Sequence, residues 1–385
     1  DDIEKEDTSS ISSIDRPFDP KKIDIVTKQM ILEVIFRRLR RNEIDLNTFF
    51  QRGEDLWDKT KQSRLIESTL IRLPLPAFYF DGSDDNKWLV VDGLQRLSTF
   101  KNYIIEKNFE LQNMEYLTQF NGCRFDKLPR ELQRRIEEQE ITVYIINPGT
   151  PEEVKFNLFK RINTGGLILT AQEIRHAINQ GIPANFIKDL AELIEFTKYN
   201  INPKRMLDRD FVTRFVAFYI QNPEEYSPDL DNFLNESMSK LKELTKQERE
   251  QIRFSFKKAL VIAWDIFGDD AFRKRYNTTD NRRPRNKALF EVWTVELSKL
   301  QDEEIKVLKA RKDILIQGFI TLLNSDQEFE KAITASTGDK KRVEKRFKAI
   351  KEYMDKFRDE AEAGTIEMDA ADERAHKFFR AFVDT

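Results

Sequence analysis

The sequence predicts an α+β protein, with a small mixed sheet and its helices in the first half and helices alone in the second. Short β-branched and aromatic runs bounded by turn residues occur only before about residue 150. Beyond about Gly181, large apolar residues instead recur at helical offsets among charged residues. A chain of 385 residues is long enough for two domains. We expect a flexible polar tail over 1–20, a first domain over 21–182 and a helical domain over 183–385.

Two helices are expected at the start of the first domain. Apolar residues lie near helical spacing from Ile23 to Leu39, and the arginines that follow suit the C-terminal end of a helix. A second apolar series runs from Gln62 to Leu73 and stops at Pro74. Both stretches are therefore predicted to be helical.

A hairpin and a third strand are expected to form the sheet. The runs Ala77–Phe80 and Trp88–Val91 are β-prone and are separated by the turn-forming residues 81–86. Another β-branched run, Ile141–Ile146, ends at Asn147-Pro148-Gly149. Together these runs predict a small mixed sheet.

A glycine-containing loop lies between two predicted helix starts. Thr150 and Thr170 each stand three residues before a glutamate, the pattern of a capping box. The loop between these helices contains Asn163, Thr164, Gly165 and Gly166. Glycine lets a backbone approach a ligand closely, so a binding loop is one interpretation, and a helix C-cap is the other.

The segment from Val90 to Phe100 is predicted to be a strand, a turn at Asp92-Gly93 and a helix. Gln95 and Arg96 would lie in the first helical turn, where unpaired N–H groups and the helix dipole favour an anion. Asp92 could hold a ribose hydroxyl, a metal-bound water or a water nucleophile, and Gln95 could orient a water. The alternative is a plain turn capped by Asp92.

Composition narrows the classes of function. With 65 Lys and Arg against 68 Asp and Glu, the net charge of −3 gives no global attraction to a polyanion, so any nucleic-acid contact must be a local patch. A single cysteine, Cys123, excludes an internal disulfide and fits a reducing, cytoplasmic location. No run is apolar enough to span a membrane. We assign no metal site to the chain itself.

One basic segment is a candidate for weak, salt-sensitive contacts with DNA phosphates. A solvated loop is the alternative interpretation. Its cations are Arg273, Lys274, Arg275, Arg282, Arg283 and Arg285.

Three segments carry a resemblance to a known family. They are Phe50-Gln51-Arg52 with Trp57 and Gln62-Ser63-Arg64, then Val91 to Leu97, then Phe159 to Gly166 with Leu169, Glu173 and Arg175. In this order and spacing they resemble the N-terminal domain of GmrSD-type modification-dependent restriction systems, which has a ParB/sulfiredoxin-like fold. Residues 205–206, 271–273, 288–293 and 342–350 also resemble the helical continuation of that family.

The resemblance implies binding and hydrolysis of a nucleoside triphosphate, with or without Mg²⁺, and sensing of modified DNA. The signature of the family is an Asp-Gly-Gln-Gln-Arg box, and this chain keeps all of it except the first glutamine, which is Leu94. The catalytic residues implied are Asp92, Gln95 and Arg96. The nucleotide- and phosphate-binding residues implied are Gln51, Arg52, Arg64, Gly93, Asn163, Thr164, Gly165 and Gly166. From the residues alone, the arginines could equally pair with Glu54, Asp55 or Glu67.

The partners implied are DNA and a separate nuclease. HNH nucleases, often fused to this domain, require histidines at their metal centre, and the chain has only His176 and His376. We therefore expect the chain to be a nucleotide-dependent DNA sensor of an anti-phage system, and an oligomer is compatible with the sequence. The alternative is a non-catalytic ParB-like DNA-binding or scaffolding protein.

Overall fold

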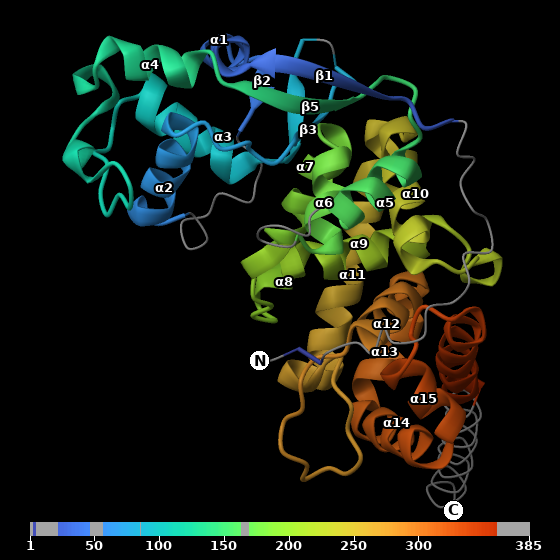
Figure 1. Ribbon diagram of the computed structural model, residues 1–385. Coiled ribbons are helices and arrows are strands. Elements are labelled where there is room, and N and C mark those ends of the chain that lie inside the picture. The colour runs from blue at the N-terminus through green and yellow to red at the C-terminus, as the bar shows by residue number, and fades with distance from the viewer. Residues whose placement is uncertain (1–2, 5–21, 47–56, 85, 163–168, 360–385) are drawn as a thin grey trace, which may run out of the picture. The chain divides into compact units, whose positions relative to one another are not determined.

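The computed structural model describes residues 3–4, 22–46, 57–84, 86–162 and 169–359 (Figure 1). The chain divides into two compact units, one formed by Pro17–Gln180 and the other by Gly181–Thr385 together with Asp1–Arg16. The first unit carries a mixed sheet and the second is helical, so the predicted α+β class is confirmed.

The sheet has five strands in the order β1-β5-β3-β4-β2. Their bounds are β1 Ile25–Ile31, β2 Ile44–Asp45, β3 Phe78–Asp81, β4 Trp88–Asp92 and β5 Glu140–Ile146. The β3–β4 hairpin was predicted, and so was β5 as its partner. β5 runs parallel to β3 and antiparallel to β1, and β2 runs parallel to β4, so the sheet is mixed.

The predicted helix from Ile23 to Leu39 is wrong in its first half. Residues Ile25–Ile31 form β1, and the helix α1 begins only at Leu32. The run contains β-branched residues, and all seven of its positions pair with β5. Tertiary pairing with a strand more than 100 residues away in sequence therefore outweighs the local helical periodicity.

Two groups of helices cover the two faces of the sheet. Phe78, Phe80 and Val143 point into the larger core, which also contains apolar residues of the helices on that side. Those helices are α1 Leu32–Arg40, α2 Lys59–Leu70, α3 Leu94–Phe100 and α4 Arg130–Glu137. The helices α5 Glu152–Ile162 and α6 Ala171–Ile178 pack on the opposite face through Phe156, Phe159 and Ile174, and α6 begins with the predicted capping box.

The buried carboxylate of Glu67, on α2, holds the loop that follows α3. It accepts hydrogen bonds from the backbone N–H groups of Glu115, Tyr116 and Leu117 at 2.6–2.9 Å. Burial alone would raise the pKa of Glu67, but these donors and nearby Arg64 more than offset it, and the net effect lowers the pKa.

We expect the contribution of Glu67 to stability to depend on pH. A carboxyl whose folded-state pKa is lowered stabilises the fold above its unfolded pKa and loses this effect as the pH falls through the folded value. Glu67→Gln should therefore lower the free energy of unfolding by about 2–3 kcal/mol at pH 7. This difference from wild type should become smaller as the pH falls below 4.5, the ordinary pKa of a glutamate. Urea denaturation from pH 7 to pH 3 measures this difference, and a constant difference would contradict the assignment.

The second unit is built from helices around one core. Their bounds are α7 Ile182–Ala191, α8 Ile194–Thr197, α9 Leu207–Ile220, α10 Leu230–Glu243, α11 Lys246–Phe267, α12 Lys287–Lys299, α13 Asp302–Ala310, α14 Lys312–Ser325 and α15 Gln327–Thr334. A last helix covers 340–359. Phe215, Phe256 and Phe290 are fully buried and lie in ring contact at its centre, which confirms the predicted helical second half.

A buried charge network links α9, α12 and the last helix. The carboxylate of Glu291 accepts hydrogen bonds from the guanidinium of Arg214 at 3.2 Å and from that of Arg346. All three side chains are at most 4% exposed. Arg346 also donates to the carbonyl of Thr337 at 2.7 Å. The network ties together three segments that are far apart in sequence.

Across the part of the chain that the structure describes, no helix combines the length and apolar character needed to cross a bilayer.

Candidate functional site

A β-bulge places Asp92 at the end of β4. Phe80 pairs with Val90, but the next residue of β3, Tyr79, pairs with Asp92, so Val91 is the extra residue. Val91 packs in the core under α5 and α6. Partners in an antiparallel pair point to the same side of a sheet, and bulges often re-aim a side chain beside a functional site. The bulge therefore makes Asp92, at the end of β4, the register partner of Tyr79.

The guanidinium of Arg96 holds Asp92 in position. It forms an ion pair with the Asp92 carboxylate at 2.8 Å and donates to the backbone carbonyls of Pro76 and Ala77. It also lies 4.3 Å from the ring of Phe78. Burial lowers the pKa of Arg96, and Asp92 partly compensates. With 9% of its side chain exposed, Arg96 points into the fold, whereas Asp92 keeps 27% exposed.

Gly93 makes the turn between β4 and α3 possible. Its φ is +98°, in the left-handed region, and a Cβ there would lie 2.4 Å from Cδ1 of Phe78. Only glycine fits this position without strain. The predicted strand, turn and helix are confirmed.

Gln95 links the turn to the segment before α2. Its Oε1 accepts a hydrogen bond from the backbone N–H of Trp57 at 3.2 Å. Gln62, on α2, donates to the carbonyl of Trp57 at 2.6 Å. The Gln95 side chain is thus held by Trp57, which Gln62 in turn ties to α2.

An aromatic pair begins at Tyr79, the register partner of Asp92. Tyr79 and Tyr144 are register partners on β3 and β5, and their rings stack with centroids 4.7 Å apart at 14°. Both side chains are half-buried, and Thr27 on β1 is the next partner along this row. Burial, Tyr144 and Asp92 together raise the pKa of Tyr79. The sequence analysis did not identify this pair, because it becomes a neighbour of Asp92 only through strand register.

Arg64 lies on α2 in a salt-bridge cluster. Its guanidinium is 3.6 Å from the carboxylate of Glu67 and pairs with Glu115. Pairing with Glu67 was the alternative to a phosphate contact. The role of Arg64 toward a phosphate stays a prediction.

Several predicted binding residues lie outside the described part of the chain. They are Gln51, Arg52, Asn163, Thr164, Gly165 and Gly166. The described site therefore consists of Asp92, Gly93, Gln95 and Arg96 with the tyrosine pair.

A buried lysine fastens α5 to the β3–β4 hairpin, and the sequence analysis missed it. The ammonium of Lys155 pairs with the carboxylate of Asp81 at 3.1 Å and contacts the hydroxyl of Ser83. Both charged side chains are at most 10% exposed. The cluster fixes α5 over the face that carries the tyrosines. Its only signal in the sequence is a lysine on the apolar side of a helix.

The predicted DNA-contacting cations have different environments. Arg273, Lys274 and Arg285 are at most 6% exposed. Arg275 and Arg282 pair with Asp269 or Asp270 at 3.4–3.5 Å. Arg283 is exposed and lies 4.6 Å from the ring of Tyr276. The outer side of this loop therefore presents Arg282 and Arg283, and contact with DNA stays a prediction.

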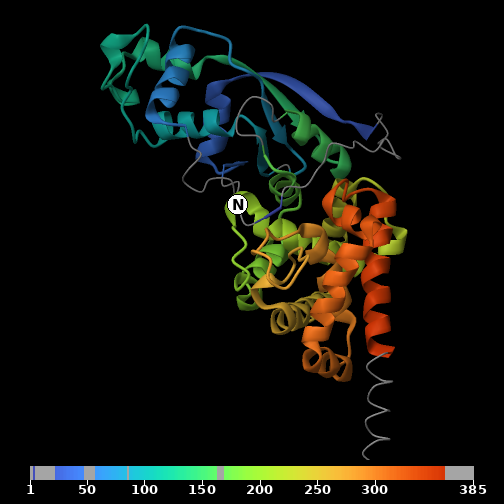
Figure 2. The ribbon, with the colours of Figure 1, turned by 90° about the horizontal axis from the view of Figure 1, so that it is seen from below.

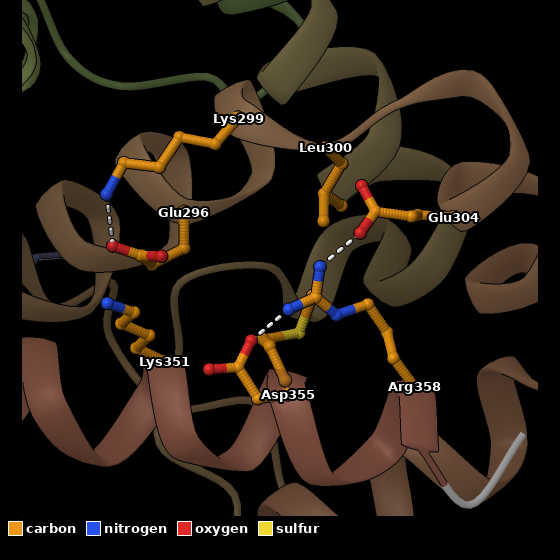
Figure 3. Close-up of a pocket in the computed structure, with 8 residues that line it drawn as sticks. Glu296, Lys299, Leu300, Glu304, Lys351, Asp355 and Arg358 are labelled. Atoms are coloured by element: carbon orange, nitrogen blue, oxygen red, sulfur yellow. Dashed lines mark hydrogen bonds and ion pairs between the residues drawn. The ribbon is translucent and has the colours of Figure 1, made fainter.

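The helical unit contains a polar cavity of about 210 Å³ (Figure 3). Its charged groups largely neutralise one another: Glu296 pairs with Lys299 at 2.7 Å, and Arg358 bridges Glu304 and Asp355. This cavity contains no residue of the Asp92 site. Within the described ranges, no three His, Cys, Asp or Glu side chains come together as metal ligands would.

The first unit matches a known protein family. Residues 32–180 match the family model of the GmrSD restriction endonuclease, N-terminal domain. This range begins with α1 and ends just after α6, so it contains Asp92, Gln95 and Arg96. No curated protein matches the chain.

Proposed function

We propose that this chain is a component of a restriction system, which binds a nucleoside triphosphate at Asp92 and uses it in sensing DNA; the match of residues 32–180 to the model of the GmrSD restriction endonuclease N-terminal domain supports this role. One observation carries the proposal: a carboxylate that is 27% exposed and is held by a buried arginine is the register neighbour of a stacked tyrosine pair.

Asp92 is suited to the polar end of a nucleotide. Its carboxylate, 27% exposed, could accept a hydrogen bond from a ribose hydroxyl or hold a water of a Mg²⁺ ion. Mg²⁺ in nucleotide sites often takes one or two carboxylates together with substrate phosphates and waters. The neighbouring Tyr79 and Tyr144 offer aromatic surface of the kind on which bases stack. Gln95 is placed one turn away to orient a water.

In this proposal Arg96 is a positioning residue. Its contacts with Asp92, Pro76 and Ala77 fix the carboxylate relative to β3. A phosphate would then depend on other cations, such as those implied at Arg52 and Arg64. Recognition of DNA belongs to the helical unit, where Arg282 and Arg283 are exposed, and cleavage belongs to a partner nuclease.

We expect Asp92→Asn to lower nucleotide turnover by at least about 100-fold, the usual scale for a group that positions or activates water. Phosphate release from the purified full chain, with each nucleoside triphosphate and Mg²⁺, measures this effect. The matched control is Glu131→Gln, which removes a carboxylate that is 71% exposed on α4 of the same unit. Turnover in Asp92→Asn equal to that of the control would exclude Asp92 from the reaction.

A second candidate is a ParB-like DNA-binding or scaffolding protein that binds nucleotide without hydrolysing it. Two observations favour this function. The Arg96 guanidinium already donates to Pro76, Ala77 and Asp92 and so is not directed at a phosphate, and the apolar Leu94 replaces a glutamine of the family's box. The same experiment separates the two functions. Tight nucleotide binding by wild type without phosphate release supports the scaffold and excludes the hydrolase.

A further inference from the structure

The first described residues of the chain dock on the helical unit. Ile3 forms a parallel bridge with Arg285, and the backbone N–H of Glu4 donates to the carbonyl of Arg285 at 2.8 Å. Ile3 also packs against the core of the helical unit. Figures 1 and 2 show this short blue segment beside the orange helical unit. A segment predicted to be a tail thus makes both backbone and side-chain contacts.

The Glu4 carboxylate fills a polar pocket. One oxygen accepts from the ammonium of Lys274 at 2.7 Å, and the other accepts from the side-chain amide of Asn286 at 3.0 Å. Lys274 and Asn286 are 6% and 4% exposed. Charge-assisted contacts from two buried donors to one carboxylate are stronger than those of an exposed ion pair.

The rest of the fold holds both donors in place without help from Glu4. The Asn286 side chain also donates to the carbonyl of Ile333 at 2.6 Å and caps α12 at the N–H of Leu289. Lys274 also donates to the hydroxyl of Thr334 at 2.6 Å. The pocket is therefore preformed.

The charge of the pocket explains why it binds a carboxylate. Among the described residues, a second carboxylate near the Lys274 ammonium is that of Glu330, at 3.9 Å. Tyr276 donates to that carboxylate at 3.0 Å. Without Glu4, the contacts of the buried ammonium among the described residues are this distant carboxylate and the neutral hydroxyl of Thr334. An inadequately paired buried charge is costly. An incoming carboxylate restores the pairing.

We propose that Lys274 and Asn286 form a carboxylate-binding site for an extended segment with a hydrophobic residue before a glutamate. Ile3–Glu4 fills this site as an exchangeable latch, and the same segment supplied in trans competes for it. The backbone pairing with Arg285 selects an extended segment, and the contact of Ile3 with the core selects the hydrophobic residue.

A peptide-binding experiment tests the latch. A fluorescent peptide of residues 1–8 is titrated into the chain lacking residues 1–8 and into the full chain, and anisotropy is measured. We expect binding to the shortened chain and at least about tenfold weaker binding to the full chain, whose own segment is present at high effective concentration. A Glu4→Gln peptide should bind the shortened chain about tenfold more weakly.

Matched variants identify the pocket. Lys274→Met in the shortened chain should abolish binding, whereas Lys331→Met, which removes a lysine that is 53% exposed on α15, should preserve it. If the shortened chain does not fold, as judged by circular dichroism, full-length Glu4→Gln replaces it and should bind the peptide more tightly than wild type. Equal binding of the native and Glu4→Gln peptides, or no binding to any form with an open pocket, would overturn the proposal.

Discussion

Glu291→Gln should destabilise the helical unit by about 3–5 kcal/mol, the usual cost of removing one partner from a buried charge pair. The substitution keeps the shape of the side chain and removes its charge. The guanidinium groups of Arg214 and Arg346 then face a neutral amide in a site where neither side chain is more than 4% exposed. The urea midpoint of the helical unit at pH 7 measures the effect.

Glu296→Gln is the matched control for Glu291→Gln. It makes the same chemical change on the same helix, but Glu296 pairs at 2.7 Å with Lys299, which is 54% exposed. The Glu296 side chain is 11% exposed, but the solvent around Lys299 screens the pair, so we expect this control to lose about 1 kcal/mol. If Glu291→Gln destabilises the unit no more than Glu296→Gln does, the charge network does not hold the three helical segments together.

Local patterns predicted much of the fold correctly. The hairpin was visible because β-prone runs flank a cluster of turn residues, and α6 because Thr170 and Glu173 form a capping box. β1 was missed because its residues also fit a helical period. Its strand conformation depends on β5, which follows more than 100 residues later. Pairing over such a distance leaves little trace in a single sequence.

Long-range strand pairing also explains why the sequence located only part of the candidate site. Asp92, Gly93, Gln95 and Arg96 are adjacent in sequence and lie on one strand-turn-helix, so a motif could locate them. The tyrosine pair could not be found this way, since Tyr79 and Tyr144 meet only through the register of β3 and β5. The direction of the Arg96 side chain also depends on carbonyls of another segment, at Pro76 and Ala77.

Gly93→Ala is expected to damage both the fold and the site. A residue other than glycine at φ +98° carries about 1–3 kcal/mol of backbone strain. The new Cβ would also lie 2.4 Å from Cδ1 of buried Phe78, and overpacking adds about 1–3 kcal/mol. We therefore expect a total loss of about 2–6 kcal/mol, measured by thermal or urea unfolding.

Gly122→Ala separates the destabilisation caused by backbone strain from that caused by the contact with Phe78. Gly122 lies in the same unit at φ +83°, but a Cβ there meets no atom within 4 Å. It should show the backbone strain alone, about 1 kcal/mol or slightly more.

The ring of Phe78 lies under the Arg96 guanidinium, so displacing this ring should move Arg96 and with it Asp92. Gly93→Ala should then lose nucleotide binding even under conditions where it remains folded, while Gly122→Ala keeps it. Equal stability losses in the two variants would mean that the contact with Phe78 does not restrict the turn, and that Asp92 is held by the ion pair with Arg96 alone.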